Sequence, residues 1–304
     1  MSAPAFCQAR AKITTGLLRD VLHGAASKFA ETFGELWTWR GRRVFALDGS
    51  KFNLARSEEL DRHFGRPTSA HFPQATVSAL VNVASALPCD VLIAPYGSCE
   101  RKLLLQHLDV LQHGDVVVLD RGHPSHDVLR ALLERKLDFL VRVPESSSFD
   151  AVEVFRQSGG NDHRVVIAPP KKRRGLEPIE LRAVKLQKAD DFDQRQFHAR
   201  TALGVEQEIL AQELFIVIAR FLMATAAEHA DVDYRDISRK SAVLGLAAYI
   251  SRVCLDDPRS AATWLPRLLA RIARTRDKRR AGRSFPRRSF KPGPRWGPTG
   301  RHGA

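Results

Sequence analysis

The first forty residues carry apolar side chains at steps of three and four positions. Such spacing lines one face of a helix, so the pattern predicts helices over Ala5–Lys12 and Leu17–Phe33, with a glycine near the end of each. After Arg43 the pattern changes to alternation or to unbroken apolar runs, which are typical of strands. We therefore expect residues 1–43 to form an N-terminal helical segment ahead of a domain that contains β structure.

Strand-like and helix-like segments alternate from residue 44 to residue 143. The strand-like segments are Val44–Leu47, Thr76–Ala84, Asp90–Ala94, Asp115–Leu119 and Phe139–Val143, and the helix-like ones are Glu100–His113 and His126–Arg135. Leu87-Pro88 predicts a hairpin between the second and third strands, and Gly114 is placed to end the first helix. Strand, hairpin, helix, strand, helix and strand in this order are typical of a mixed α/β domain in three layers.

The remaining chain divides at changes in pattern. Residues from about 145 to 196 predict a small β-rich insertion, with strands at Val165–Ala168 and Ile179–Leu186 on either side of a basic loop. Three helices follow, over Thr201–Ala227, Ser238–Val253 and Ala261–Arg274. We expect a core of residues 44–228 that includes the insertion, C-terminal helices in 229–274, and a basic flexible tail in 275–304. Prolines and glycines in that tail are unsuited to a packed core.

Positive charge is concentrated at the end of the chain. The 304 residues include 48 Lys and Arg against 34 Asp and Glu, which gives +14. From Arg271 onward there are twelve basic residues and one acid, so this stretch supplies +11 of the +14. Such a polycation suits the phosphates of DNA, although a charge run is also typical of a solvated surface. The expected DNA contacts are Lys171, Lys172, Arg173 and Arg174 in the insertion and Arg279, Arg280, Arg283, Arg287 and Arg288 in the tail.

The sequence predicts neither a membrane protein nor a secreted one. Its longest apolar stretch, Leu214–Ala227, is interrupted by Arg220 and is shorter than the roughly 20 residues that cross a bilayer. The first residues lack the apolar region of a secretory signal. Four cysteines are too few and too scattered for a disulfide framework or a zinc site. We expect a cytoplasmic protein with free thiols.

Two aspartates, Asp48 and Asp120, each follow an apolar strand and precede a glycine by one or two residues. Carboxylates that converge from two strands repel each other by roughly 4 kcal/mol at ~4 Å and an effective dielectric near 20, so a close pair favours a cation or a shared proton. Hard oxygen ligands select Mg²⁺ or Mn²⁺. Asp-Gly is also a common hairpin turn, and this reading stays open. His123 and His126 could orient a phosphate or water, or could simply be polar groups at a helix start.

Seven short segments form a pattern that covers nearly the whole chain. They are Phe45–Ser50, Tyr96–Arg101, Asp115–Gly122, Phe139–Pro144, Phe197–Ala202, Gln207–Gln212 and Arg279–Arg288. In order and spacing they resemble the DDE transposases of the IS4 type. Each segment alone is a weak signal, but seven in the right order are a strong one. The resemblance implies an α/β fold, a ribonuclease H-like mixed sheet with flanking helices. It makes Asp48 and Asp120 the first and second catalytic, metal-binding carboxylates.

The resemblance also implies an activity and partners. The activity is metal-dependent DNA strand cleavage and strand transfer in DNA transposition, with Mg²⁺ (or Mn²⁺) as cofactor. The partners are double-stranded DNA, as element ends and as target, together with a second copy of the chain or an intact transposase. The expected location is the bacterial cytoplasm, at the nucleoid.

The third carboxylate of this family departs from the pattern. The family carries it on a Tyr-x2-Arg-x3-Glu-x6-Lys helix between the insertion and the Phe197–Ala202 segment, and no segment here fits that spacing. We therefore expect an internal deletion with its junction within residues 187–196. Glu206 or Glu208 on the following helix could substitute, as could Asp190, Asp191 or Asp193 at the junction. A catalytic group must be held to within about 0.5 Å, which an accidental replacement rarely achieves.

The expected function is accordingly an impaired transposase. Two alternatives stay open at this stage. The first is a non-catalytic DNA-binding remnant or inhibitor of transposition, which the basic tail would suit. The second is a metal-dependent nuclease or phosphatase outside this family, which fits the two aspartates but not the tail.

Overall fold

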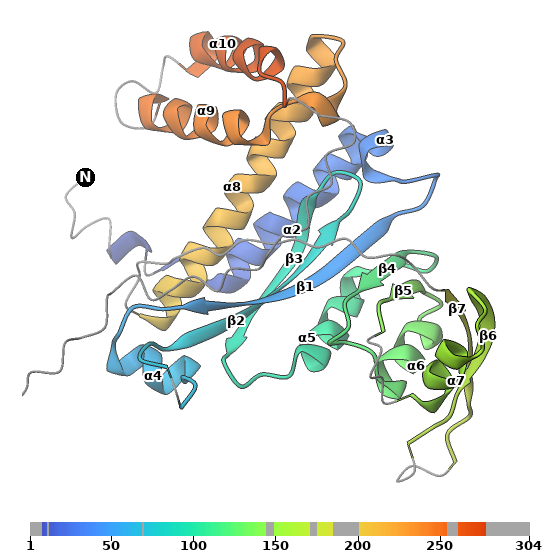
Figure 1. Ribbon diagram of the computed structural model, residues 1–304. Helices are drawn as coiled ribbons and strands as arrows, with labels where there is room; N and C mark the ends of the chain where they lie inside the picture. The colour runs from blue at the N-terminus through green and yellow to red at the C-terminus, as the bar shows by residue number, and fades with distance from the viewer. Residues whose placement is uncertain are drawn as a thin grey trace, which may run out of the picture.

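A mixed five-stranded sheet lies at the centre of the computed structural model, which describes residues 8–10, 12–68, 70–143, 149–170, 175–184, 201–253 and 261–277 (Figure 1). The strand order is β3-β2-β1-β4-β5. The antiparallel strands are β1 (Val44–Asn53), β2 (Gln74–Asn82) and β3 (Leu87–Pro95), and the strands parallel to β1 are β4 (Val116–Leu119) and β5 (Asp138–Val141). The unbroken apolar run of β4 suits a central strand that is covered on both faces.

Two long helices, α2 (Thr15–Thr32) and α8 (Ala202–His229), pack against each other and against β3. Figure 1 shows them crossing the sheet side by side. The apolar period of α2 brings Phe29 into this interface, where its ring meets Phe221 of α8 edge-on, with ring centroids 5.4 Å apart. Such aromatic pairs contribute about 0.5–1.5 kcal/mol beyond the area they bury, so this contact helps to hold α8 on the sheet.

Two shorter helices connect the strands that build the parallel half of the sheet. α5 (Glu100–His107), continued by the 3₁₀ turn η1 (Leu108–Val110), joins β3 to β4, and α6 (His126–Glu134) joins β4 to β5. α6 begins where the Ser125 hydroxyl accepts a hydrogen bond from the Val128 N–H at 3.3 Å, which satisfies one free donor of the first turn. The turn between β4 and α6 therefore lies at the carboxyl end of β4, the edge where open α/β sheets build their sites.

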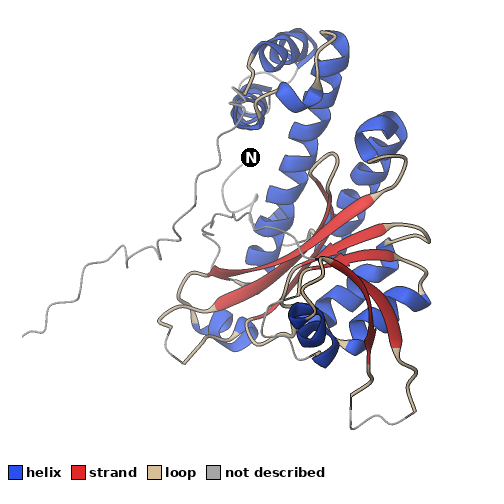
Figure 2. Ribbon diagram, turned by 45° about the vertical axis from the view of Figure 1, so that its right-hand side comes forward, coloured by secondary structure: helices blue, strands red, loops and turns tan. Residues whose placement is uncertain are grey.

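Smaller elements surround this core. Beside α6, a separate apolar cluster joins α7 (Asp150–Gln157), β6 (Asp162–Ile167) and β7 (Ile179–Val184). At the end of α8 lie η2 (Tyr234–Asp236), α9 (Arg239–Ser251) and α10 (Ala261–Arg274), and the first half of the chain adds α3 (Gly34–Trp37) and α4 (Glu58–Phe64). Figure 2 shows the α8–α10 unit and the β6–β7 ribbon on opposite sides of the five-stranded sheet.

The predicted order of strands and helices over residues 44–143 is confirmed, as are the three helices after residue 200 to within two residues at each end. Three predicted boundaries are wrong. Leu87-Pro88 lies within β3 and the turn falls at residues 83–86; a proline is tolerated there because β3 is an edge strand. The helix predicted over 100–113 ends at His107. β1 continues past Leu47 because β2 pairs with it as far as Asn53.

The insertion also differs from its prediction, because it contains a helix as well as two strands. α7 places an apolar side, including the buried Phe155, against β6. A helix of eight residues makes about two turns, too few for the helical period to stand out, so only the two strands were predicted. The predicted division of the chain at residues 43, 228 and 274 stays a prediction.

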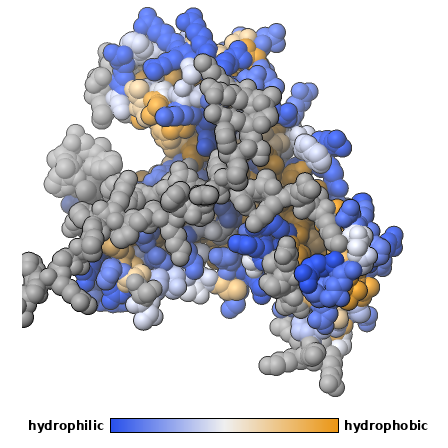
Figure 3. Space-filling view, viewed as in Figure 1, coloured by the Kyte–Doolittle hydropathy of each residue, from blue (hydrophilic) through white to orange (hydrophobic). Residues whose placement is uncertain are grey.

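By length and composition alone α8 is long and apolar enough to cross a membrane, a test that the core helix of a soluble protein also passes. In the structure α8 is a core helix, packed by α2, β3, α9 and α10. Its one internal arginine, Arg220, is buried and donates a hydrogen bond to the Tyr234 hydroxyl at 3.4 Å, which in turn donates to the Ser85 carbonyl at 3.0 Å. Figure 3 shows apolar surface beside α8 and α9, and each carries an exposed apolar side chain, Ile218 and Leu244.

Candidate metal centre

The register of β1 and β4 places Asp48 and Asp120 side by side. Leu47 pairs with Leu119 in this parallel ladder, and the two aspartates are the next residue on each strand. Neighbouring strands lie about 4.8 Å apart, so the two carboxyl groups extend from adjacent backbone positions. Asp48 is not part of a hairpin turn, because it lies inside β1 and pairs with Ala79 of β2.

The surroundings of Asp48 make its charge unfavourable. Partial burial is the largest influence and raises the pKa of its carboxyl group, while a hydrogen bond from the Gly49 N–H lowers that pKa. Repulsion by Asp120 and by Glu100 raises the pKa further, and His123 lowers it. The net direction is upward, as expected where negative charges gather without enough positive charge to balance them.

Asp120 is balanced by one arginine. Its Oδ1 lies 2.8 Å from Nε of Arg142, and both side chains are about half exposed, at 52% and 50%. Arg142 follows β5, and its N–H donates to the Leu119 carbonyl at 2.9 Å. The ion pair therefore joins the carboxyl ends of two parallel strands, in a place where solvent weakens it.

Glu100 is a third acid at this edge, and the sequence analysis did not single it out as a functional residue. It is the first residue of α5, and its carboxyl group lies over two glycines. A Cβ built on Gly49 would be 3.5 Å from the carboxyl carbon of Glu100, and one built on Gly122 would be 3.4 Å from its Oε2. Arg101 fixes the same helix end by donating from Nε to the Gly122 carbonyl at 3.3 Å. The only sequence signal for Glu100 is its place in the Tyr96–Arg101 segment.

Two histidines at the start of α6 are buried without hydrogen-bond partners in the described residues. His123 and His126 are each 3% exposed, and none of their four ring nitrogens has a partner there. The His123 N–H donates to the Asp120 carbonyl at 3.1 Å, so this residue is tied to the Asp120 turn. Its influence on the pKa of Asp48 shows that its ring lies within electrostatic range of the acids.

The residues at this edge fit a divalent cation in their chemistry. Three carboxylates are hard oxygen donors of the kind that Mg²⁺ and Mn²⁺ prefer, the two glycines leave space for one of them, and His123 has unused ring nitrogens. Within the described ranges no three His, Cys, Asp or Glu side chains are yet close enough to surround an ion. Asp120 is instead paired with Arg142.

The other predicted site residues lie elsewhere. Glu206 is on α8, where its Oε1 is 3.5 Å from Nε2 of His63 on α4, and Glu208 is on the same helix. The basic residues Lys171, Lys172, Arg173, Arg174, Arg279, Arg280, Arg283, Arg287 and Arg288 lie outside the described residues, as does the expected junction at 187–196.

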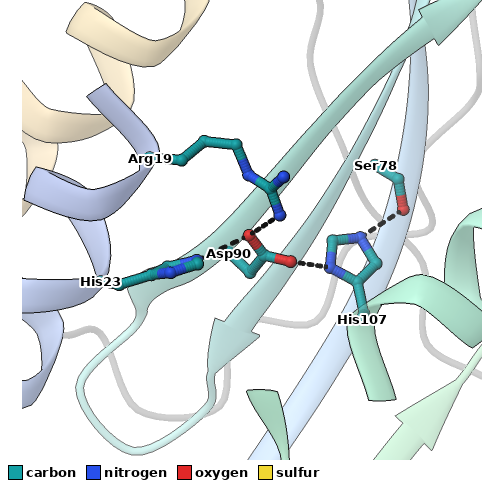
Figure 4. A network of polar contacts seen from close by, with 5 residues as sticks. All are labelled: Arg19, His23, Ser78, Asp90 and His107. Carbon is teal, nitrogen blue, oxygen red and sulfur yellow. Dashed lines mark hydrogen bonds and ion pairs between the residues drawn. The ribbon is translucent and has the colours of Figure 1, made fainter. Parts of the chain in front are cut away.

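A second polar cluster surrounds Asp90 on β3 (Figure 4). Its carboxylate contacts Arg19 at 2.9 Å and His23 at 2.8 Å, and its other oxygen lies 2.8 Å from Nδ1 of His107, whose Nε2 is 3.0 Å from the Ser78 hydroxyl. Burial raises the pKa of Asp90, but hydrogen bonds from His107, His23 and Arg19 lower it more, so the pKa lies well below its usual range.

This cluster has the order of a Ser-His-Asp triad but not its accessibility. Asp90 and His107 are fully buried and Ser78 is 1% exposed, so the hydroxyl cannot meet a substrate. Its role is to hold elements together: His107 is the last residue of α5 and Glu100 the first. The cluster thereby fixes the helix that carries Glu100 to β2, β3 and α2.

The fold and this edge define an α/β protein with an acidic centre at the ends of parallel strands. Residues 39–218 match the family described as "Transposase DDE domain", and the chain belongs to that family.

One curated relative and two solved structures show how remote the individual likenesses are. The chain is similar to "Putative transposase InsZ" of Escherichia coli (strain K12), with 26% identity over 102 residues, 32% of this chain and 34% of that one. It therefore matches about a third of that relative's length. It is also similar to the piggyBac transposase in a cryo-EM synaptic complex with hairpin DNA (TM-score 0.42, 11% identity, 88% of this chain and 64% of that one). The Mos1 transposase in a paired-end complex with the left transposon end is a further likeness (TM-score 0.26, 10% identity, 42% and 43%).

Proposed function

We propose that this chain is a DNA transposase of the IS4 type with a ribonuclease H-like core, in which Asp48 and Asp120 hold Mg²⁺ or Mn²⁺. Membership of the transposase DDE domain family supports the transposase role. One observation carries the residue assignment: the β1–β4 register sets the two aspartates at adjacent backbone positions, Asp48 within β1 and Asp120 directly after β4. The sheet order, three antiparallel strands followed by two parallel ones, supports the core type.

The chemistry proposed for this edge is phosphodiester cleavage followed by strand transfer. A bound divalent cation would lower the pKa of an attacking water or 3′-hydroxyl and stabilise the leaving oxygen. The residues of the chain would position the cation and balance the charges around it. Asp48 and Asp120 project from a rigid sheet, and Arg142 must exchange its carboxylate partner for solvent or for a DNA phosphate. The buried His123 is placed to receive or donate one hydrogen bond beside the reacting phosphate.

The partners that we propose are double-stranded DNA, as element ends and target, and a second copy of the chain or an intact transposase. Phosphate contacts would come from Lys171–Arg174 and from the tail arginines 279, 280, 283, 287 and 288. Such contacts give affinity without sequence specificity. This assignment places the protein on bacterial DNA in the cytoplasm.

We also propose that strand cleavage is weak, because the family's Glu-bearing helix is missing from the sequence, with a deletion at 187–196. Under this proposal the chain binds DNA better than it cuts it. A non-catalytic remnant or inhibitor of transposition is the limiting case, in which cleavage is absent.

Nicking of supercoiled plasmid in Mg²⁺ and in Mn²⁺ tests the proposal, with Asp48→Ala and Asp120→Ala beside the unchanged chain. Asp109→Ala is the matched control, because it also removes an exposed aspartate paired with an arginine, Arg135. We expect slow nicking that both site variants abolish and the control retains. Nicking that survives both site variants refutes the site, and rapid nicking refutes the impairment. DNA retardation in a gel without any nicking identifies the remnant.

A further inference from the structure

We propose that Glu100 is a ligand of the divalent cation and supplies the third carboxylate of this centre from α5. The proposal rests on the metal-binding role given above to Asp48 and Asp120. Under this proposal Glu100 provides, among the described residues, the third carboxylate that the family carries on the helix missing from this sequence.

The carboxyl group of Glu100 lies beside Gly49 in β1 and Gly122 after β4. A Cβ built on either glycine would be 3.4–3.5 Å from that carboxyl group, so a larger side chain at either position would compete with it for space. Gly49 follows Asp48 directly and Gly122 lies two residues after Asp120, so the Glu100 carboxyl group lies close to the backbone that carries the two aspartates.

Three carboxyl groups, those of Asp48, Asp120 and Glu100, gather at one edge of the sheet. Arg142 balances Asp120, but Glu100 has no ion-pair partner in the part of the chain that the structure describes. Its neighbour Arg101 donates to a backbone carbonyl instead. A divalent cation would balance the two remaining negative charges.

His123, whose N–H donates to the Asp120 carbonyl, is buried with both ring nitrogens unpartnered among the described residues. An unsatisfied buried polar group costs about 1–3 kcal/mol, and buried polar groups are satisfied in most native structures. A cation or its bound water at the acidic edge supplies such a partner, so the orphaned imidazole points to a ligand there.

The ion pair of Asp120 with Arg142 is compatible with cation binding, because both side chains are half exposed and solvent weakens the contact. A divalent cation would attract Asp120 more strongly than the single charge of Arg142 does. Asp120 could then exchange Arg142 for the ion, and Glu100 could reach the same ion by rotation about its side-chain bonds. α5 itself need not move, because the buried Asp90–His107 contact holds its other end.

The direct test is Mn²⁺ binding to the full chain without DNA. Binding is measured from the electron paramagnetic resonance signal of free Mn²⁺ and by isothermal titration calorimetry. The variants are Glu100→Gln and Asp48→Asn, with Glu206→Gln for the competing acid on α8. We expect Glu100→Gln and Asp48→Asn each to weaken binding at least tenfold and Glu206→Gln to leave it unchanged. Thermal melts in EDTA establish that each variant folds, and Mn²⁺ should raise the Tm of the unchanged chain but not that of Glu100→Gln.

A second pair of variants tests the same centre without changing a charge. Gly122→Leu should displace the Glu100 carboxyl group and weaken Mn²⁺ binding. Gly97→Leu, at a glycine with no atom within 4 Å of a built Cβ, should not. Unchanged affinity in Glu100→Gln with lost affinity in Asp48→Asn overturns the Glu100 proposal alone and leaves the two-aspartate site standing. Loss of Mn²⁺ affinity in Glu206→Gln but not in Glu100→Gln also overturns the Glu100 proposal. No Mn²⁺ binding by the unchanged chain overturns both.

Discussion

The buried carboxylate of Asp90 supports the junction of α2, β2, β3 and α5, and Asp90→Asn tests how much the fold depends on it. The substitution keeps the shape and removes the charge. Removing one partner of a buried ion pair costs about 3–5 kcal/mol. Arg19 and His23 are about one-third exposed, at 37% and 35%, so water replaces part of what they lose. We therefore expect the lower end, about 3 kcal/mol of unfolding free energy.

Urea unfolding followed by circular dichroism at neutral pH measures this loss. Asp162→Asn is the matched control, since Asp162 pairs with Arg182 on the exposed face of β6 and β7; its midpoint should stay where it was. A loss below about 1 kcal/mol, within the range of an exposed pair, or an equal shift in both variants, would refute the reasoning.

The pH dependence of the free energy of unfolding tests independently whether the Asp90 charge stabilises the fold. The folded-state pKa of Asp90 lies below its unfolded value, so its charge stabilises the fold above the ordinary aspartate pKa of about 3.9. That contribution is lost progressively as the pH falls below this value. The gap in stability between the unchanged chain and Asp90→Asn should therefore be constant near neutrality and shrink in acid.

Three further outcomes are expected. Arg142→Gln removes a positive charge beside Asp120, so it should strengthen Mn²⁺ binding by about 1 kcal/mol, roughly fivefold in affinity. Arg135→Gln, beside the exposed Asp109, should leave the Mn²⁺ affinity unchanged in the same titration. Gly245→Ala places a Cβ 2.8 Å from Cδ1 of the buried Leu268, so this leucine must shift in the α9–α10 interface, at a cost of about 1–3 kcal/mol. Gly24→Ala, where nothing lies within 4 Å, is the control, and equal melting temperatures of the two variants would contradict the prediction. A variant with five tail arginines changed to Gln should show a weaker salt dependence of DNA binding: Arg279, Arg280, Arg283, Arg287 and Arg288. The slope of log K against log salt concentration should fall by about 0.9 for each lost phosphate contact. An unchanged slope, measured by fluorescence anisotropy, would exclude the tail from the interface.

The sequence predicted that Asp48 and Asp120 follow two strands of one sheet, because that signal is local. Each follows an apolar run and lies one or two residues before a glycine, and such positions meet at one edge of an α/β sheet. The residue pattern also predicted the succession of strands and helices along residues 44–143. The pattern misplaced the hairpin at Leu87-Pro88. A proline is tolerated in a strand that lies at the edge of a sheet, and whether a strand lies at the edge is decided only when the sheet assembles.

Glu100 and the Asp90 cluster could not be predicted in this way. Glu100 reaches Gly49 and Gly122 only because α5 returns from the edge strand β3 to the middle of the sheet. His107 meets Asp90 and Ser78 across three elements that are distant in sequence. Neither contact has a spacing rule, because both depend on the path of the chain between elements. A helix whose first residue is acidic is otherwise ordinary, since acids favour that position in any helix.

The acidic edge draws all its residues from one continuous stretch, from Asp48 to Arg142, ahead of α7, the β6–β7 ribbon and α8. Under the proposed function, changes farther along the chain could alter strand cleavage without touching the residues proposed to hold the cation. Cation binding and strand cleavage would then be separable properties of one chain.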